Sequence, residues 1–264
     1  MAPMKVYGWL VSPWMAKVLL CLEEAGVEYE VVPLSLTNGD HRRPEHLARN
    51  VRILILCSLP LDVFSLEKLR KNGVEWLTDI SILQPFGQIP VLEDGDLTLY
   101  QSHAIARYIL GKHKPELLGL GEGGSVEESA MVDMWLEVET HQYEPAMKPI
   151  VWHCIVHQYV GLDRDQGVVD ESLEKLRKVL EVYEARLSSS GSAGQYLAGG
   201  DRVSLADLSH FSLMHYFTAT EYAGVLDEYP RVKAWWEALL ARPSVKKVIA
   251  GMPTDFGFGS GNFP

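Results

Sequence analysis

Alternating apolar and polar positions near the start of the chain predict a strand, a helix and a second strand in succession. Residues 4–9 alternate well enough for a short strand, and residues 27–32 alternate apolar and charged side chains, as a half-buried strand does. Between them, an apolar pattern of helical period begins after Ser12 and Pro13 and ends at Gly26. Serine is a favoured N-cap, proline suits the first helical position, and glycine commonly ends a helix. The segment therefore predicts a β-α-β unit.

The stretch 85–105 predicts a hairpin of two strands that leads into a helix. Pro90 stands at the start of an apolar run, where a strand tolerates the missing backbone N–H. The residues Asp-Gly-Asp at 94–96, between two apolar runs, are typical of a tight hairpin turn. Gln101 and Ser102 then open a helical pattern, so free N–H groups and a hydroxyl lie together at a helix N-terminus. We expect a ligand carboxylate to bind there.

After a connection rich in proline and glycine at 113–124, the pattern is helical almost throughout. Two pairs, Ser125 with Glu128 and Ser204 with Asp207, are typical of helix starts in which side chains satisfy the first backbone N–H groups. The pattern thus divides the chain into an α/β domain at 1–112, a linker at 113–124, an all-α helical domain at 125–252, and a Gly-rich flexible tail at 253–264.

One segment inside the α/β domain, residues 51–84, does not fit this scheme. Residues 51–57 form an apolar run broken only by Arg52. Residues 65–71 have a helical pattern that ends at an Asn-Gly pair. Taken alone, the two patterns predict an ordinary strand and helix.

Composition and charge exclude several functions. The net charge of −11 argues against a nucleic-acid partner, because binding to phosphates requires clustered Lys and Arg. The 3 cysteines are widely spaced and form no CxxC motif, which is typical of a reducing compartment and indicates neither a disulfide framework nor a metal site. No apolar stretch reaches about 18 residues and no signal peptide is visible, so we expect a cytoplasmic protein without a membrane partner.

Several single residues have either a structural role or a role in ligand binding, and the sequence leaves both open. Ser12 is either a plain helix cap or a site group, because a strand-to-helix turn projects its side chain at the sheet edge where ligands of α/β folds bind. The helix dipole there would favour an anion such as a thiolate. His41 and Arg42 belong either to a solvated loop or to a clamp for a ligand carboxylate. His153 and His157 are four positions apart but lack a carboxylate context, so we expect no metal.

Several motifs, in order along the chain, resemble those of a plant glutathione transferase of the phi class. They are Met-Ala-Pro-Met-Lys-Val-Tyr-Gly at 1–8, Asp-His-Arg-Arg-Pro-Glu-His-Leu-Ala-Arg-Asn at 40–50, Pro-Phe-Gly-Gln-Ile-Pro at 85–90, Gln-Ser-His-Ala-Ile at 101–105 and Lys-Ala-Trp-Trp at 233–236. The resemblance implies a thioredoxin-like N-terminal domain, an all-α C-terminal domain, a homodimer, and glutathione as co-substrate for conjugation to small hydrophobic electrophiles.

The resemblance also implies roles for particular residues. Ser12 is similar to the family's catalytic serine, which stabilises the glutathione thiolate. The implied glutathione-binding residues are His41, Arg42, Gln88, Ile89, Gln101 and Ser102, and Pro90 is expected to follow a cis peptide bond. The implied site for the hydrophobic substrate comprises Trp14, Leu36, Trp152 and Val156, while Phe86 is the implied dimer contact. Gln101 stands where the family more often has Glu, and His103 stands in place of its usual Arg.

The resemblance is interrupted by 34 residues, Val51 to Gln84, that separate two motifs which the family joins directly. Valine codons begin with GT and a glutamine codon can end with AG, which are the two ends of an intron. We therefore hypothesise a retained, in-frame intron or a gene-model error. Three hypotheses for the function stay open. The chain is an active transferase with possible peroxidase activity, a non-catalytic carrier of apolar ligands, or an inactive splice product.

Overall fold

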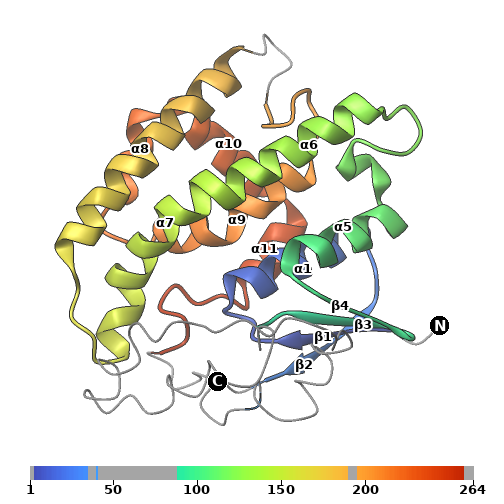
Figure 1. Cartoon of the computed structure of the whole chain (residues 1–264), viewed down its shortest axis with the longest axis horizontal. Helices are drawn as coiled ribbons and strands as arrows, with labels where there is room; N and C mark the ends of the chain where they lie inside the picture. Colours follow the sequence, from blue (N-terminus) through green and yellow to red (C-terminus); the bar gives the residue numbers. More distant parts are fainter. Residues whose placement is uncertain (1–2, 35–39, 41–87, 190–194, 259–264) are drawn as a thin grey trace, which may run out of the picture.

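The computed structural model describes residues 3–34, 40, 88–189 and 195–258 (Figure 1). Within these residues the strands form a four-stranded sheet in the order β2-β1-β3-β4. The strands are β1 (Met4–Gly8), β2 (Tyr29–Pro33), β3 (Val91–Asp94) and β4 (Leu97–Tyr100). β1 and β2 are parallel, whereas β3 is antiparallel to both β1 and β4. The predicted β-α-β unit and hairpin are confirmed.

Local sequence explains where the first helix, α1 (Pro13–Ala25), begins and ends. Ser12 has extended backbone angles, and its Oγ accepts the backbone N–H of Met15 at 3.4 Å. Gly26 ends the helix with a φ of 64°, a left-handed angle that glycine adopts without steric cost. The hairpin turns at Gly95 for the same reason, with a φ of 61°.

The rest of the described chain is helical. Its α-helices are α5 (Ser102–His113), α6 (Val126–Val138), α7 (Glu144–Val151), α8 (Gln166–Ser189), α9 (Leu205–Phe217), α10 (Pro230–Ala241) and α11 (Pro243–Ile249). Short 3-10 turns are η3 (Pro115–Leu118), η6 (His157–Tyr159) and η8 (Ala223–Glu228), and two π-turns, η4 (Glu139–Tyr143) and η5 (Trp152–Val156), flank α7. The predicted starts at Ser125 and Ser204 are confirmed as caps of α6 and α9.

Proline accounts for the wide turns around α7. Pro145 and Pro149 lack the N–H groups that a regular helix would give to the carbonyls four positions earlier. In η4 the N–H of Glu144 instead reaches the carbonyl of Glu139, five positions back. Such π-turns frequently occur at functional sites.

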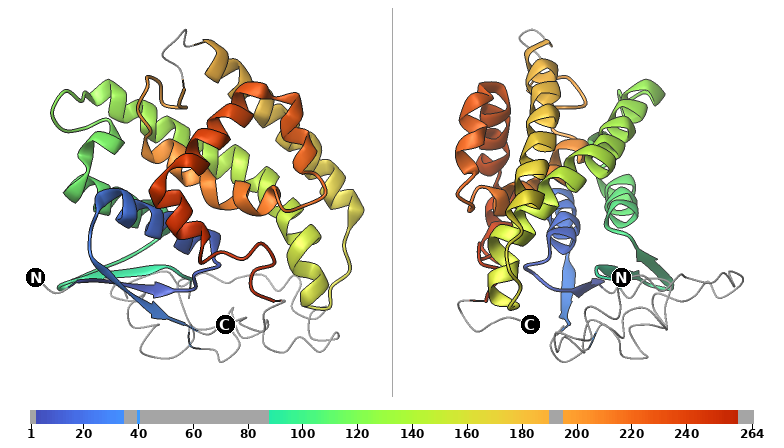
Figure 2. Two further views of the ribbon diagram at one scale, coloured as in Figure 1. Left: turned by 180° about the vertical axis from the view of Figure 1, so that it is seen from behind. Right: turned by 60° about the vertical axis from the view of Figure 1, so that its left-hand side comes forward.

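The elements form layers, with α1 and α5 lying between the sheet and the other helices (Figures 1 and 2). One continuous cluster of buried apolar residues runs through both parts, from Val6 in β1 to Trp235 in α10. Between the parts, the partly buried Arg242 guanidinium donates to both carboxylate oxygens of Glu24, at 2.7 and 2.6 Å. The predicted combination of an α/β domain with an all-α helical domain is therefore confirmed.

Candidate active site

The register of the sheet places three candidate segments at one edge. Tyr7 pairs with Val91, and Val91 pairs with Tyr100. Consequently the turn after β1, the residues before β3 and the start of α5 all meet the sheet at the carboxyl end of β1. Ligands of α/β folds bind at such edges. The predicted site residues that lie along this edge are Ser12, Gln88, Ile89, Gln101 and Ser102.

Ser12 is buried in the turn between β1 and α1, with 4% of its surface exposed. Its Oγ accepts the Met15 N–H, and among the described residues it donates to no acceptor. The hydroxyl proton is therefore available to a ligand, at a helix N-terminus that favours negative charge. The two interpretations of Ser12 are compatible, because capping uses the oxygen and leaves the proton free.

A tyrosine from the helical domain holds this turn. The Tyr216 hydroxyl on α9 donates to the Val11 carbonyl at 2.6 Å, across 205 sequence positions. The Tyr216 ring stacks on Phe256 at a centroid distance of 3.8 Å. Phe256 is buried, although it falls within 253–264, the range expected to be a flexible tail. The sequence patterns gave no signal for either aromatic residue, because their contacts lie far away along the chain.

The start of α5 presents polar groups at the same edge. The Ile89–Pro90 peptide bond is cis, as the resemblance implies. Gln101 has a φ of 70°, and its exposed side-chain amide donates to Gln88 Oε1 at 3.5 Å, a long and therefore weak bond. Ser102 is buried as the first residue of α5. A helix N-terminus of this kind suits the charged end of a ligand.

A buried charge cluster lies directly behind the edge. Lys17 of α1 donates to Glu139 Oε1 in η4 at 3.1 Å, and its Nζ lies 2.8 Å from His103 Nε2 on α5. Thr140 donates its hydroxyl proton to the Leu136 carbonyl, so its oxygen, 3.3 Å from His103 Nδ1, accepts from that nitrogen. Nδ1 of His103 therefore carries a proton, and Nε2 faces the other two members of the cluster, Lys17 and Glu139.

The cluster holds Glu139 in its charged form. Burial by itself would raise the pKa of this carboxyl, but Lys17 and His103 outweigh burial and lower the pKa to about 2. Glu139 Oε2 lies 3.1 Å from His103 Nε2, yet it accepts no hydrogen bond within the described part of the chain. His103, which the resemblance places where the family has Arg, thus joins α5 to both α1 and η4.

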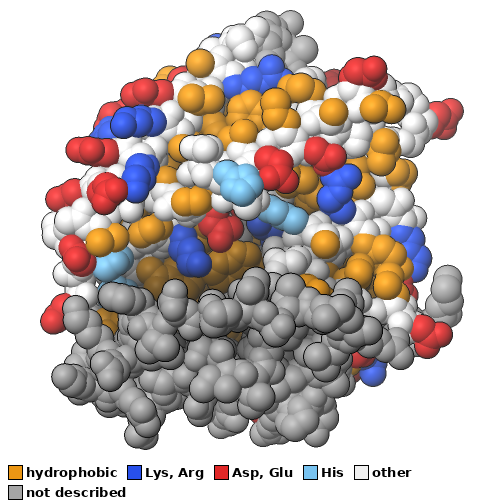
Figure 3. Space-filling model, in the orientation of Figure 1, with side chains coloured by type: hydrophobic (Ala, Val, Ile, Leu, Met, Phe, Trp, Pro, Cys, Tyr) orange, Lys and Arg blue, Asp and Glu red, His pale blue; other side chains and the backbone are white. Residues whose placement is uncertain are grey.

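An aromatic patch stands beside Ser12. Trp14 of α1 and Trp152 of η5 have ring centroids 6.1 Å apart, and Phe256 meets Trp152 edge-on at 5.8 Å. The Lys148 ammonium on α7 lies 4.9 Å from the Trp14 centroid. The Trp14 Nε1–H donates to Glu144 at 3.4 Å. Figure 3 shows recessed hydrophobic side chains next to the grey atoms, with both positive and negative side chains at their rim.

The other predicted residues are divided between the described and undescribed parts of the chain. Val156 is half-buried at the end of η5, four positions after Trp152. Four predicted site residues lie outside the described residues, namely Leu36, His41, Arg42 and Phe86, as does the whole of the segment 51–84. Their roles stay predictions.

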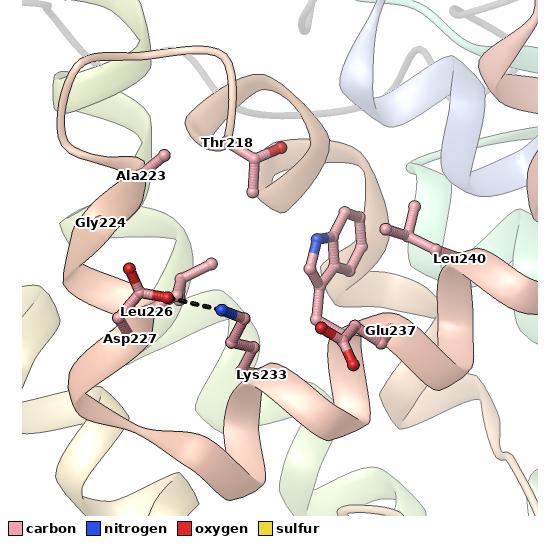
Figure 4. A pocket seen from close by; sticks show the side chains of 9 residues that line it. Thr218, Ala223, Gly224, Leu226, Asp227, Lys233, Glu237 and Leu240 are labelled. Atoms are coloured by element: carbon pink, nitrogen blue, oxygen red, sulfur yellow. Dashed lines mark hydrogen bonds and ion pairs between the residues drawn. The ribbon is translucent and has the colours of Figure 1, made fainter.

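A separate pocket of about 360 Å³ lies between η8 and α10 in the helical domain. Lys233 and Asp227 point toward each other at this pocket and form an ion pair at 2.6 Å (Figure 4). Its apolar lining residues include Leu226, Trp236 and Leu240. None of the predicted site residues lines this pocket, so it is distinct from the candidate active site.

The described residues contain no group of three or more His, Cys, Asp and Glu side chains placed to hold a metal ion. His153 Nδ1 instead accepts the Asp165 backbone N–H at 3.1 Å. Burial raises the pKa of the Cys154 thiol to about 11 and that of Cys21 further, so neither is a thiolate near neutral pH. No described helix combines the length and apolar character needed to cross a membrane.

Comparison with known proteins gives consistent similarities along the chain. The family described as "Glutathione S-transferase, N-terminal domain" matches residues 11–111, and "Glutathione S-transferase, C-terminal domain" matches residues 143–243. Glutathione S-transferase 4 of Zea mays is 51% identical over 96% of this chain and 95% of its own length.

Two solved structures are similar in both sequence and fold. A glutathione S-transferase I bound with lactoylglutathione has a TM-score of 0.76 and 46% identity, over 95% of this chain and 100% of its own. Glutathione S-transferase I from maize, in complex with an atrazine glutathione conjugate, has the same score and identity, over 95% of this chain and 98% of its own.

Proposed function

Since this chain belongs to the glutathione S-transferase family, we propose that it conjugates glutathione through a thiolate stabilised by the Ser12 hydroxyl. It is an enzyme, a glutathione S-transferase, and glutathione is its co-substrate. The role of the serine rests on one observation above all. Within the described part of the chain the Ser12 hydroxyl donates to no acceptor, and it lies at the N-terminus of α1, at the sheet edge shared with the cis peptide before Pro90 and with Ser102.

The chemistry assigned to Ser12 is electrostatic. A hydroxyl that donates to sulfur favours the thiolate over the thiol, and the α1 dipole acts in the same direction. The thiol proton leaves to solvent, and the sulfur then attacks the electrophilic atom of the acceptor. The serine itself forms no covalent bond in this mechanism.

The glutathione-binding residues follow the same edge. The backbone around Gln88 and Ile89 would pair with the cysteinyl part, and Gln101 with Ser102 would hold the γ-glutamyl end. His41 and Arg42 would hold the glycine carboxylate, since both are donors and Arg binds carboxylates through two parallel hydrogen bonds. The assignment of the γ-glutamyl end to Gln101 and Ser102 is supported by their position at the start of α5, because a helix N-terminus binds carboxylates.

The acceptor would bind on the aromatic patch beside Ser12. Trp14, Trp152, Val156 and Leu36 are apolar or aromatic, which suits small hydrophobic electrophiles. Organic hydroperoxides would be reduced at the same place as a side activity. The alternative function, a non-catalytic carrier of apolar ligands, would use the same surface, but the position of the Ser12 hydroxyl at a helix N-terminus favours catalysis.

We extend the proposal to class, assembly and location. The ordered phi-class motifs support a phi-class enzyme, and Phe86 would contact the second copy of a homodimer. A cytoplasmic location is supported by the cysteine pattern, since the thiols are not spaced as disulfide or metal ligands. Size-exclusion chromatography with light scattering tests the dimer, and a Phe86→Ala variant should shift it toward monomer.

We further propose that the segment from Val51 to Gln84 is a retained intron. The support is that the family motifs on either side would be contiguous without it, and that the codons at its ends allow intron boundaries. Sequencing the transcript across this junction tests the idea. An abundant message that carries the segment, with genomic introns elsewhere removed, would reject it.

The role of Ser12 is tested by Ser12→Ala with Ser125→Ala as a matched control. Both serines cap a helix through Oγ, Ser12 for α1 and Ser125 for α6 at 3.1 Å, so both variants lose about 1 kcal/mol of cap stability. Only Ser12→Ala should lower kcat with a chlorodinitrobenzene acceptor, on the order of a hundredfold, while glutathione affinity changes little. Equal losses of kcat and glutathione affinity would show that Ser12 only binds.

A further inference from the structure

The acceptor side of the site carries one lysine in an unusual environment. Lys148 on α7 is half-buried, and its Nζ lies 4.9 Å from the ring centroid of Trp14 and 5.7 Å from that of Trp152. A cation over aromatic faces is attracted to both rings. The ammonium is therefore held at the patch that the two indoles form, close to the first turn of α1.

Lys148 has no carboxylate partner among the residues that the structure describes. Several other lysines do have one, for example Lys17 with Glu139 at 3.1 Å and Lys175 with Glu171 at 2.7 Å. The carboxylate nearest in sequence on α7, that of Glu144, accepts the Trp14 Nε1–H and makes no ion pair with Lys148. A half-buried positive charge thus faces an apolar aromatic surface, and no carboxylate of the described ranges pairs with it.

From this arrangement we infer that Lys148 selects aromatic acceptors that carry an anionic substituent. The inference rests on the proposed function and specifies the substrate class of the same site. The acceptor ring packs against Trp14 and Trp152, and its carboxylate pairs with the Lys148 ammonium. Partial burial strengthens such a pair relative to one in free solution, because water screens it less.

The reaction for such a substrate is balanced without any further reagent. The thiolate sulfur of glutathione attacks the ring carbon that bears a halogen, a carbon–sulfur bond forms, and the halide leaves with the electron pair of the broken bond. The thiol proton has gone to solvent. Lys148 contacts the substituent and not the reacting atoms, so its effect belongs to acceptor binding.

The experiment compares a chlorodinitrobenzoate with its methyl ester, which has the same leaving group but no charge. The measured quantity is the ratio of kcat/KM for the acid to kcat/KM for the ester. In Lys148→Gln this ratio should fall on the order of fivefold through KM, as expected for loss of one ion pair. Glu144→Gln should raise the ratio, because it removes a negative charge beside the site. Lys175→Gln, which removes an exposed lysine from α8, is the matched control and should leave the ratio unchanged.

The outcomes separate the inference from the function on which it rests. An unchanged ratio in Lys148→Gln, with both acceptors converted, would overturn the inference alone. Failure of the unmodified enzyme to convert either acceptor would overturn the proposed function. In that case quenching of tryptophan fluorescence still measures the binding of acid and ester, and equal Kd ratios for the enzyme and Lys148→Gln would overturn the inference as well.

Discussion

His210 is a buried ring on α9 whose protonation state is fixed by two hydrogen bonds. Its Nδ1–H donates to the Ala206 carbonyl at 2.6 Å, and its Nε2 accepts from the Tyr183 hydroxyl at 2.7 Å. Burial lowers its pKa from 6.5 to about 4, although Glu139 partly opposes the shift. At the pH where an exposed histidine begins to take up a proton, the His210 ring is therefore still neutral in the folded enzyme.

The lowered pKa of His210 predicts that the free energy of unfolding decreases as the pH falls. Between pH 6.5 and about 4 the unfolded chain binds a proton on His210 that the folded chain does not. The stabilisation is fully present above pH 6.5 and is lost as the pH falls, up to about 3 kcal/mol by pH 4. Urea unfolding at a series of pH values measures this loss, and His210→Gln should flatten the pH dependence in that window.

The control for this prediction is His141→Gln, since His141 is exposed on η4 and pairs with Glu137 at 3.0 Å on the surface. That variant should keep the pH dependence of the unmodified enzyme. If His210→Gln retained the full slope between pH 6.5 and 4, another group would be responsible for it.

Single residues also show where prediction from sequence stops. The cap at Ser12 and the glycine stop at Gly26 were predictable, because both depend on neighbours within four positions. The contacts of His103 were not, since its partner Glu139 is on another helix and the ring stands where the family has Arg. The hydrogen bonding of the Ser12 hydroxyl likewise follows from the folded structure and not from the local sequence.

At the scale of elements, α9 controls the turn that carries Ser12. Its Tyr216 hydroxyl is the partner of the Val11 carbonyl, so we predict that Tyr216→Phe leaves this carbonyl unpaired in a buried position. The cost should be about 1–3 kcal/mol of unfolding free energy. Turnover should fall more than glutathione affinity, because the Ser12 hydroxyl loses its fixed position.

Urea unfolding and steady-state kinetics on the same preparation check this prediction. Tyr159→Phe is the control, because Tyr159 is 43% exposed and stacks on Phe258 through its ring, a contact that loss of the hydroxyl preserves. Equal unfolding free energies for Tyr216→Phe and the unmodified enzyme would show that the bond to Val11 contributes nothing.

Most elements were predictable, because strands, hairpin and helices depend on local periodicity. The two π-turns around α7 were not. Pro145 and Pro149 are visible in the sequence, but a proline in a helical pattern predicts a break or a kink as readily as a widened turn. The chain runs without a break from α6 to η5, and Glu139 and Trp152 begin the two π-turns on either side of α7.

At the scale of the whole molecule, we predict that deletion of Val51–Gln84 raises both stability and activity. Closing a flexible loop of this length costs roughly 3 kcal/mol, and the apolar run at 51–57 favours aggregation. Thermal melts with and without glutathione, together with kcat/KM for a chlorodinitrobenzene acceptor, compare the full chain with the deletion variant. A deletion variant that was less active would show that the segment contributes to function.

The position of the site in the molecule was predictable only through the family motifs. Periodicity predicted an α/β domain and a helical domain, but not that α1 would lie between the sheet and α9. The aromatic patch combines Trp14 from the first helix with Phe256 from the last described residues. No local pattern relates positions so far apart, so only the folded structure reveals the whole patch.

The placement of α1 within a core shared by both domains has a consequence for synthesis of the chain. α1 leaves the ribosome early, whereas α9 and α11, which pack against it, are made some 180 or more residues later (residue 205 against residue 25). At a translation rate of about 5–20 residues per second, the apolar face of α1 stays exposed for roughly ten seconds or longer before α9 and α11 are made. During translation the nascent N-terminal domain is therefore a natural client for chaperones that bind exposed apolar helices.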